Sequence, residues 1–299
     1  MSKLKLSLSP SKQGYLMIAP AMIAYLLFAV YPMVDVVHMS FSSWDGLEAH
    51  STFVGLENYR AIFSSDPVFW TAFFNTIWWT LFAVTIPNLF SFVLALGLNQ
   101  LIPGRSVIRA LYYLPYIIAP IAVATIWKWM YDPFFGLFNQ ILTNLGRQNW
   151  IVDWLGDQNI ALWSVFTAYS WEQIGFSMVL FLAGLQNVSK TLLEAGRIDG
   201  AGRWALFRYV TLPALKPSIT IVFILSLINS LRAFDIVYGM TGGGPAQSTQ
   251  MLAMWAYTQS MQLGNFGRGA AISVILLIFT IAIIVPYMKW MAKNSREVK

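Results

Sequence analysis

The chain has 299 residues, of which 57% are hydrophobic and only 11% are charged. A soluble domain carries about a quarter charged residues, so this composition excludes an ordinary soluble domain and indicates that lipid surrounds much of the chain. The sequence contains no cysteine, which excludes disulfides and thiolate metal sites.

Six stretches are long and apolar enough to cross a bilayer, which takes roughly 20 residues for about 30 Å of hydrocarbon. They are residues 14–37, 70–98, 108–130, 158–185, 216–238 and 267–290. The first has an uncharged run longer than the apolar core of a signal peptide, and no small-residue cleavage site follows it, so we expect a retained membrane helix. The sequence predicts an all-α integral membrane protein, with residues 1–299 forming a single domain of six transmembrane helices.

Basic residues are distributed unevenly between the two sides of these spans. If the N-terminus is cytoplasmic, 14 of the 19 Lys and Arg residues lie on the cytoplasmic side. Arg60, Lys128, Arg147, Arg232 and Arg268 are the remainder, outside or near the outer ends of spans. This excess predicts cytoplasmic N- and C-termini. It also accounts for the net charge of +6 without a nucleic-acid partner.

A glycine run, Thr241-Gly242-Gly243-Gly244-Pro245, follows the fifth span. It lacks the Gly-Lys-Ser/Thr ending of a phosphate-binding loop, and the topology places it outside the cell, so we interpret it as a turn. The sequence shows no nucleotide-binding motif. Several spans contain proline, which membrane helices tolerate because neighbouring helices satisfy the freed carbonyls, and we expect kinks there.

A polar segment, residues 187–214, separates the fourth and fifth spans, and we call it the coupling segment. Ser189 or Thr191 can cap a first short helix, and Thr191 with Glu194 fits a capping box. Gly200 supplies a turn, and a second helix is expected to end near Pro213. An amphipathic helix lying on the lipid surface is the alternative, which the low net charge and the glycines disfavour. The pattern therefore predicts a helix–turn–helix that offers a docking surface.

Three motifs carry a resemblance to a known family. Residues 194–201 read Glu-Ala-Gly-Arg-Ile-Asp-Gly-Ala, and Phe207 and residues 212–217, Leu-Pro-Ala-Leu-Lys-Pro, follow. This segment resembles the cytoplasmic loop of binding-protein-dependent ABC importer permeases, with Gly196 in place of the more usual alanine. Residues 53–59, Phe-Val-Gly-Leu-Glu-Asn-Tyr, and the Thr-Gly-Gly-Gly-Pro loop resemble the carbohydrate branch, which includes maltose-, lactose- and glycerol-phosphate-type membrane subunits.

The resemblance implies a subunit of an ATP-driven sugar importer in a bacterial cytoplasmic membrane, working by alternating access. Its implied partners are a second, related permease subunit, two cytoplasmic ATPase subunits that bind ATP and Mg, and an extracytoplasmic sugar-binding protein. This chain would hold no cofactor, metal or catalytic residue of its own. Contact with the ATPase is implied for Glu194, Ala195, Gly196, Asp199, Gly200 and Ala201.

Polar side chains within the fourth and fifth spans are candidates for the substrate path, because such groups are costly in a membrane. Helical spacing places several of them on shared faces, and hydroxyls, amides and an aromatic ring suit a sugar. The alternative is hydrogen bonding between helices, or structural ion pairing for Glu172, Arg232 and Asp235. The predicted substrate-path residues are Tyr169, Glu172, Gln173, Phe176, Asn229, Ser230 and Arg232.

Three other functions compete with this interpretation. An ABC permease for a non-sugar solute is the first of them. A self-sufficient secondary transporter or channel should show a buried acidic relay or an inverted repeat, and neither is apparent. A membrane enzyme would need clustered Asp, Glu or His at membrane depth, whereas the acidic residues are scattered and the chain has two His.

Overall fold

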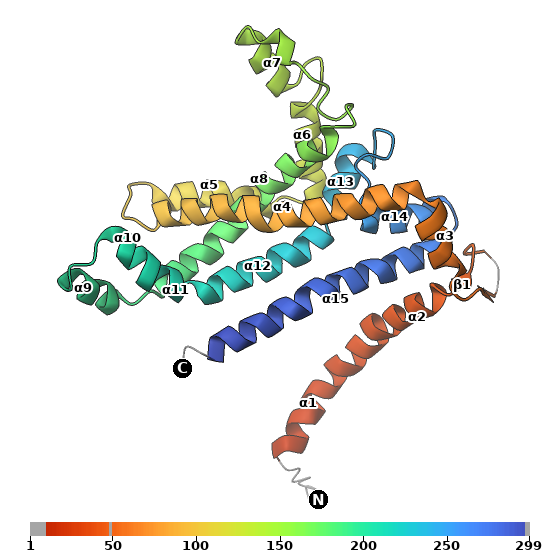
Figure 1. Ribbon diagram of the computed structural model, residues 1–299, viewed down its shortest axis with the longest axis horizontal. Coiled ribbons are helices and arrows are strands. Elements are labelled where there is room, and N and C mark those ends of the chain that lie inside the picture. Colours follow the sequence, from red (N-terminus) through yellow and green to blue (C-terminus); the bar gives the residue numbers. More distant parts are fainter. Residues whose placement is uncertain (1–9, 48–49, 297–299) are drawn as a thin grey trace, which may run out of the picture. The chain divides into compact units, whose positions relative to one another are not determined.

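The computed structural model describes residues 10–47 and 50–296, which are mostly helical (Figure 1). Lys3, Lys5 and Lys299, three of the basic residues that predict cytoplasmic termini, lie outside the described residues. Three described helices are each long and apolar enough to cross a membrane, and three bent helix pairs bring the number of candidate spans to as many as six. The predicted all-α, membrane-spanning class is confirmed.

Contacts divide the chain into two units, of which the first runs to Ser65 and resumes over Ala256–Phe279. Asn58 holds its irregular part together, because the side-chain amide donates to the carbonyls of Ser40 at 3.0 Å and Ser42 at 2.9 Å. No residue of Gly14–Met39 is buried within the described part of the chain. The elements are α1 (Pro10–Tyr25), the π-helical turn η1 (Leu26–Val30), α2 (Tyr31–Met39), β1 (Ser42–Ser43), antiparallel to β2 (Thr52–Phe53), α3 (Glu57–Ser65) and the π-helical turn η4 (Thr258–Gln262).

The second unit comprises Asp66–Trp255 and the residues from Thr280 onward. Helices α14 (Leu252–Tyr257) and α15 (Phe266–Arg296) belong partly to each unit. The elements of the second unit alone are α4 (Pro67–Leu98), α5 (Arg105–Ile117), α6 (Pro120–Met130), α7 (Leu137–Asn144), the 3₁₀ turn η2 (Gln148–Trp150), α8 (Ala161–Gln186), α9 (Lys190–Ile198), α10 (Arg203–Leu206), the π-helical turn η3 (Phe207–Thr211), α11 (Leu212–Ala214), α12 (Lys216–Leu231) and α13 (Phe234–Thr241).

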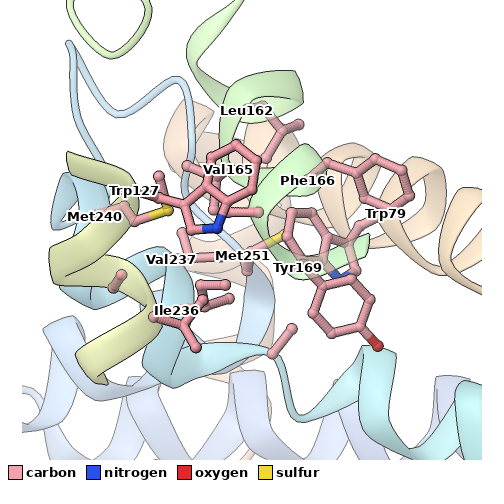
Figure 2. Close-up of a cluster of buried hydrophobic side chains, with 14 of the residues drawn as sticks. Trp79, Trp127, Leu162, Val165, Phe166, Tyr169, Ile236, Val237, Met240 and Met251 are labelled. Atoms are coloured by element: carbon pink, nitrogen blue, oxygen red, sulfur yellow. The ribbon is translucent and has the colours of Figure 1, made fainter. Parts of the chain in front are cut away.

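Helix α8 is the centre of the second unit and packs against α4, α5, α6, α12 and α13. Its apolar side chains join Trp79 and Trp127 in a buried cluster, shown in Figure 2. The ring of Trp79 lies 5.1 Å from that of Tyr169 and 5.3 Å from that of Phe166, close enough for favourable aromatic pairing. Gly175 permits α5 to approach closely, since a Cβ at this position would overlap the backbone carbonyl of Tyr112.

Polar groups also join these helices. The side chains of Asn88 on α4 and Ser226 on α12 exchange hydrogen bonds of 3.0 and 3.2 Å. The hydroxyl of Ser91 donates to the carbonyl of Ile174 on α8 at 2.7 Å. Such interhelical hydrogen bonds are typical of membrane bundles, where an unpaired polar group has no water to bind.

Two helical spans are interrupted in the same region of the second unit. Helices α5 and α6 meet at 101° across Ile118 and Ala119, both in extended conformations. Pro120 explains this break, because the residue before a proline is disfavoured in the helical region. Helices α12 and α13 are separated by Arg232 and Ala233, without a proline or glycine at the break. The expected continuous spans 108–130 and 216–238 are therefore each two helices.

Candidate functional site

The two helix breaks border a polar cavity of about 400 Å³ in the second unit. Side chains from five helices and both breaks meet here, so the site is assembled from segments distant in sequence. Its lining residues are Tyr116, Ile118, Pro120, Tyr169, Glu172, Gln173, Asn229, Arg232, Ala233, Asp235 and Ile236.

Helix α8 supplies three neighbouring lining residues, because positions 169, 172 and 173 share one helical face. The amide of Asn229 on α12 donates to the side-chain oxygen of Gln173 at 3.4 Å, so α8 and α12 meet at the wall. Tyr169 joins the wall to the core, with its ring packed beside Trp79 and its hydroxyl at the edge of the cluster (Figure 2). The cavity thus presents amides, hydroxyls and aromatic faces on a rigid support.

Five of the predicted substrate-path residues line this cavity, and two do not. Phe176 is stacked against Tyr116, with ring centroids 4.4 Å apart and planes inclined by 16°, and so supports the lining from behind. Ser230 is fully buried, and its hydroxyl donates to the carbonyl of Leu227 at 2.8 Å and lies 3.4 Å from that of Thr80 on α4. For Ser230 the structure favours the interhelical alternative.

The lining also contains Tyr116, which is not among the predicted substrate-path residues, and Asp235, for which the sequence suggested only structural ion pairing. Tyr116 lies near the end of α5. That helix contains other tyrosines, and no polar face distinguishes Tyr116 from them. Asp235 becomes part of the cavity only because α13 starts a new helix after the break. Tyr116 therefore has no local sequence signal, whereas Asp235 has one, because it is an ionisable residue within the predicted span 216–238.

The adjacent residues Asn229 and Ser230 permit a sharp test of this placement. Asn229→Leu is expected to lower substrate transport about tenfold through loss of a polar contact, with little change in thermal unfolding of the purified complex. Ser230→Leu is expected to lower the unfolding temperature, because overpacking a filled site costs about 1–3 kcal/mol. Transport assays and thermal unfolding of both variants check this, and the same response from both would contradict the assigned orientations.

The coupling segment lies at the opposite end of α8 and α12 from α6, α7 and α13 (Figure 1). Helix α9 meets α8 at 64°, and its first turn is capped by the Ser189 hydroxyl, which accepts from the Leu192 amide at 3.4 Å. Gly200 has φ +81°, a left-handed conformation in which a side chain is strained, and it makes the turn into α10. The second helix continues through η3 and α11 beyond Pro213, which stands in a first helical turn. The expected helix–turn–helix is present, and its second helix ends at Ala214, next to the predicted end at Pro213.

Most of the predicted coupling residues are exposed on this segment. Glu194, Ala195, Asp199 and Gly200 are exposed, and Gly196 and Ala201 are half-buried. A Cβ on Gly196 would lie 2.6 Å from the Leu206 side chain, so the glycine allows α9 to approach α10. Large apolar side chains are also exposed here, among them Ile198 at 86% and Trp204 at 73%. The surface therefore combines acidic groups with apolar anchors, as protein interfaces commonly do.

A polar cavity among candidate membrane spans, connected by two helices to a projecting polar segment, defines a membrane transport subunit. Residues 15–296 match the family described as binding-protein-dependent transport system inner membrane component. This match covers nearly the whole chain, so the chain belongs to this family, whose members are ABC importer permeases.

Curated relatives agree with this assignment. The trehalose/maltose transport system permease protein MalF of Thermococcus litoralis is 35% identical over 285 residues, which cover 95% of each chain. The sulfoquinovosyl glycerol transport system permease protein SmoG of Agrobacterium fabrum is 34% identical over 92% of this chain and 88% of that protein. Among solved structures, a bacterial ABC transporter involved in the import of the acidic polysaccharide alginate has the same fold, with a TM-score of 0.82, 21% identity, and coverage of 95% of this chain and 96% of that chain.

Proposed function

We propose that this protein is a permease subunit of an ATP-driven sugar importer and that the cavity between α8, α12 and the two helix breaks is part of the sugar path. The position of the cavity carries the proposal: its lining is polar, although the helices around it are apolar enough to span a membrane. Discontinuous membrane helices commonly form transport sites, because their breaks expose polar groups near the middle of the bilayer. The relatives named for sugar transport support this choice of cargo.

The lining suits a carbohydrate. Asn229 and Gln173 offer amide donors and acceptors, and the hydroxyls of Tyr116 and Tyr169 offer further hydrogen-bonding groups. The aromatic rings can pack against the C–H face of a pyranose. A secondary transporter is less well supported, because the coupling segment would then have no role.

The coupling segment is proposed to dock on a cytoplasmic ATPase subunit, which binds ATP and Mg. Helices α8 and α12 begin or end at this segment and also line the cavity, so a displacement of α9 and α10 can reach the cavity through rigid helices. In this arrangement both termini face the cytoplasm, a related permease subunit completes the path, and an external binding protein delivers the sugar. The subunit itself hydrolyses no ATP.

Reconstitution into proteoliposomes with the cognate permease, ATPase and binding protein tests the proposal. A panel of radiolabelled neutral, amino and acidic sugars, including trehalose and maltose, is offered from outside. We expect uptake of at least one sugar that requires both external binding protein and internal Mg-ATP. Uptake driven by an ion gradient without ATP would contradict an ABC mechanism, and ATP-dependent uptake of a non-sugar solute alone would contradict the cargo.

A further inference from the structure

The cavity has an unequal charge balance. Its ionisable lining comprises two carboxyl groups, on Glu172 and Asp235, and one guanidinium group, on Arg232, apart from the two tyrosines. The remaining lining residues are amides or apolar side chains. Any substrate that enters therefore meets more carboxyl groups than basic groups.

Glu172 is the more enclosed of the two acids. Its side chain lies on α8 in the cavity wall, and the residue is only 5% exposed. Within the described residues its carboxyl group has no hydrogen bond and no ion pair, although Arg232 lines the same cavity. A buried carboxyl without a protein partner is costly, so this group is available to a ligand in the cavity.

Asp235 adds a second carboxyl group to the same lining, from α13. It stands in the first turn of α13, where the free backbone N–H groups and the helix dipole favour a negative side chain. Its position follows from the break at Arg232 and Ala233, since a continuous helix would have no N-terminus here. The helix break thus supplies both a cavity and a stable site for an acidic group.

Carboxylates accept hydrogen bonds and donate none, so they pair well with sugar hydroxyls or ammonium groups. A carboxylate, sulfonate or phosphate on the sugar offers only acceptors and a like charge, and like charges repel strongly where the dielectric is low. Charge is a real variable among these importers, because the alginate transporter of the same fold carries an acidic polysaccharide.

We propose that Glu172 and Asp235 are specificity-determining residues that make this cavity accept neutral or amino sugars and reject acidic ones. The inference rests on the proposed function and assigns a substrate class to its cavity. Rejection is an active part of specificity here, because an unfavourable contact against the wrong sugar discriminates as well as a favourable contact with the right one.

The test uses the complete permease–ATPase complex in nanodiscs without binding protein, so that selectivity of the binding protein does not contribute. The probes are methyl α-glucoside, glucosamine and glucuronate, which share a ring and are neutral, cationic and anionic at pH 7. Saturation-transfer NMR gives their relative dissociation constants. We expect glucuronate to bind about tenfold or more weakly than methyl α-glucoside, given the excess of acidic over basic groups in a low-dielectric cavity.

Variants then assign the effect to the two acids. In the double variant Glu172→Gln with Asp235→Asn, the dissociation constant for glucuronate is expected to exceed that for methyl α-glucoside by about threefold or less. In Arg232→Gln this ratio of dissociation constants is expected to be larger than in wild type. Glu57→Gln, the same chemical change at an exposed residue of α3, is the matched control and should leave the ratio unchanged. Thermal unfolding of each variant identifies any that fail to fold. Because Arg232→Gln is expected to raise the ratio while the double variant lowers it, a general loss of folding cannot produce both results.

The outcomes separate this inference from the proposed function. If wild type binds glucuronate as well as methyl α-glucoside, the charge selection is wrong while the sugar cavity stands. An unchanged ratio in the double variant also overturns the inference. If none of the three probes binds, the cavity does not hold sugars, and the proposed function fails together with the inference.

Discussion

Changing Ile198 to Asp is expected to uncouple transport from ATP hydrolysis without unfolding the permease. Ile198 ends α9, is 86% exposed and belongs to a helix with no buried residue, so the change removes no core contact. In a docked complex an apolar side chain of this kind becomes buried. Loss of such an anchor costs about 2 kcal/mol or more, which weakens docking about thirtyfold or more.

Co-purification of the ATPase and ATP-driven uptake in proteoliposomes measure this effect. Leu101→Asp is the matched control, because Leu101 is likewise an exposed apolar residue, at 88%, and lies in the loop between α4 and α5. We expect this control to retain both the ATPase and uptake. Normal uptake in the Ile198 variant would show that the coupling segment is not the docking surface.

The second large effect is expected at the crossing of α5 and α8. Gly175→Leu places side-chain atoms where the backbone carbonyl of Tyr112 lies, and a backbone atom cannot move aside as a flexible side chain can. Overpacking that forces a backbone shift is expected to destabilise the fold by about 3 kcal/mol. Because Tyr116 lies one turn beyond Tyr112, the shift should also distort the cavity and lower uptake.

Thermal unfolding of the detergent-purified complex, followed by uptake, checks this expectation. Gly97→Leu is a suitable control, since Gly97 is also a helical glycine, but no atom beyond its own stretch of helix lies within 4 Å of where a Cβ would stand. The control should unfold at the wild-type temperature. An equal loss of stability in both variants would mean that the helical glycine itself, and not the close approach to α5, is responsible.

The sequence alone predicted the membrane class, the helical spans and the helix–turn–helix between the fourth and fifth of them. These features depend on properties that add along the chain. Hydropathy sums over a span, and a capping residue or a glycine turn acts on its own neighbours, as Ser189 and Gly200 do. Within the candidate site, Tyr169, Glu172 and Gln173 were also predictable, because one face of a regular helix presents all three to the cavity.

Tertiary structure decided the rest of the cavity. Asn229 and Ser230 are adjacent and both polar, yet Asn229 lines the cavity and Ser230 packs against α4. Pro120 predicts the break in the third span. No residue type predicts the break at Arg232 and Ala233, after which α13 begins and brings Asp235 into the cavity. Local sequence limits which faces of a helix can be polar. Which of those faces meets another helix and which meets a cavity depends on contacts between segments far apart in the chain.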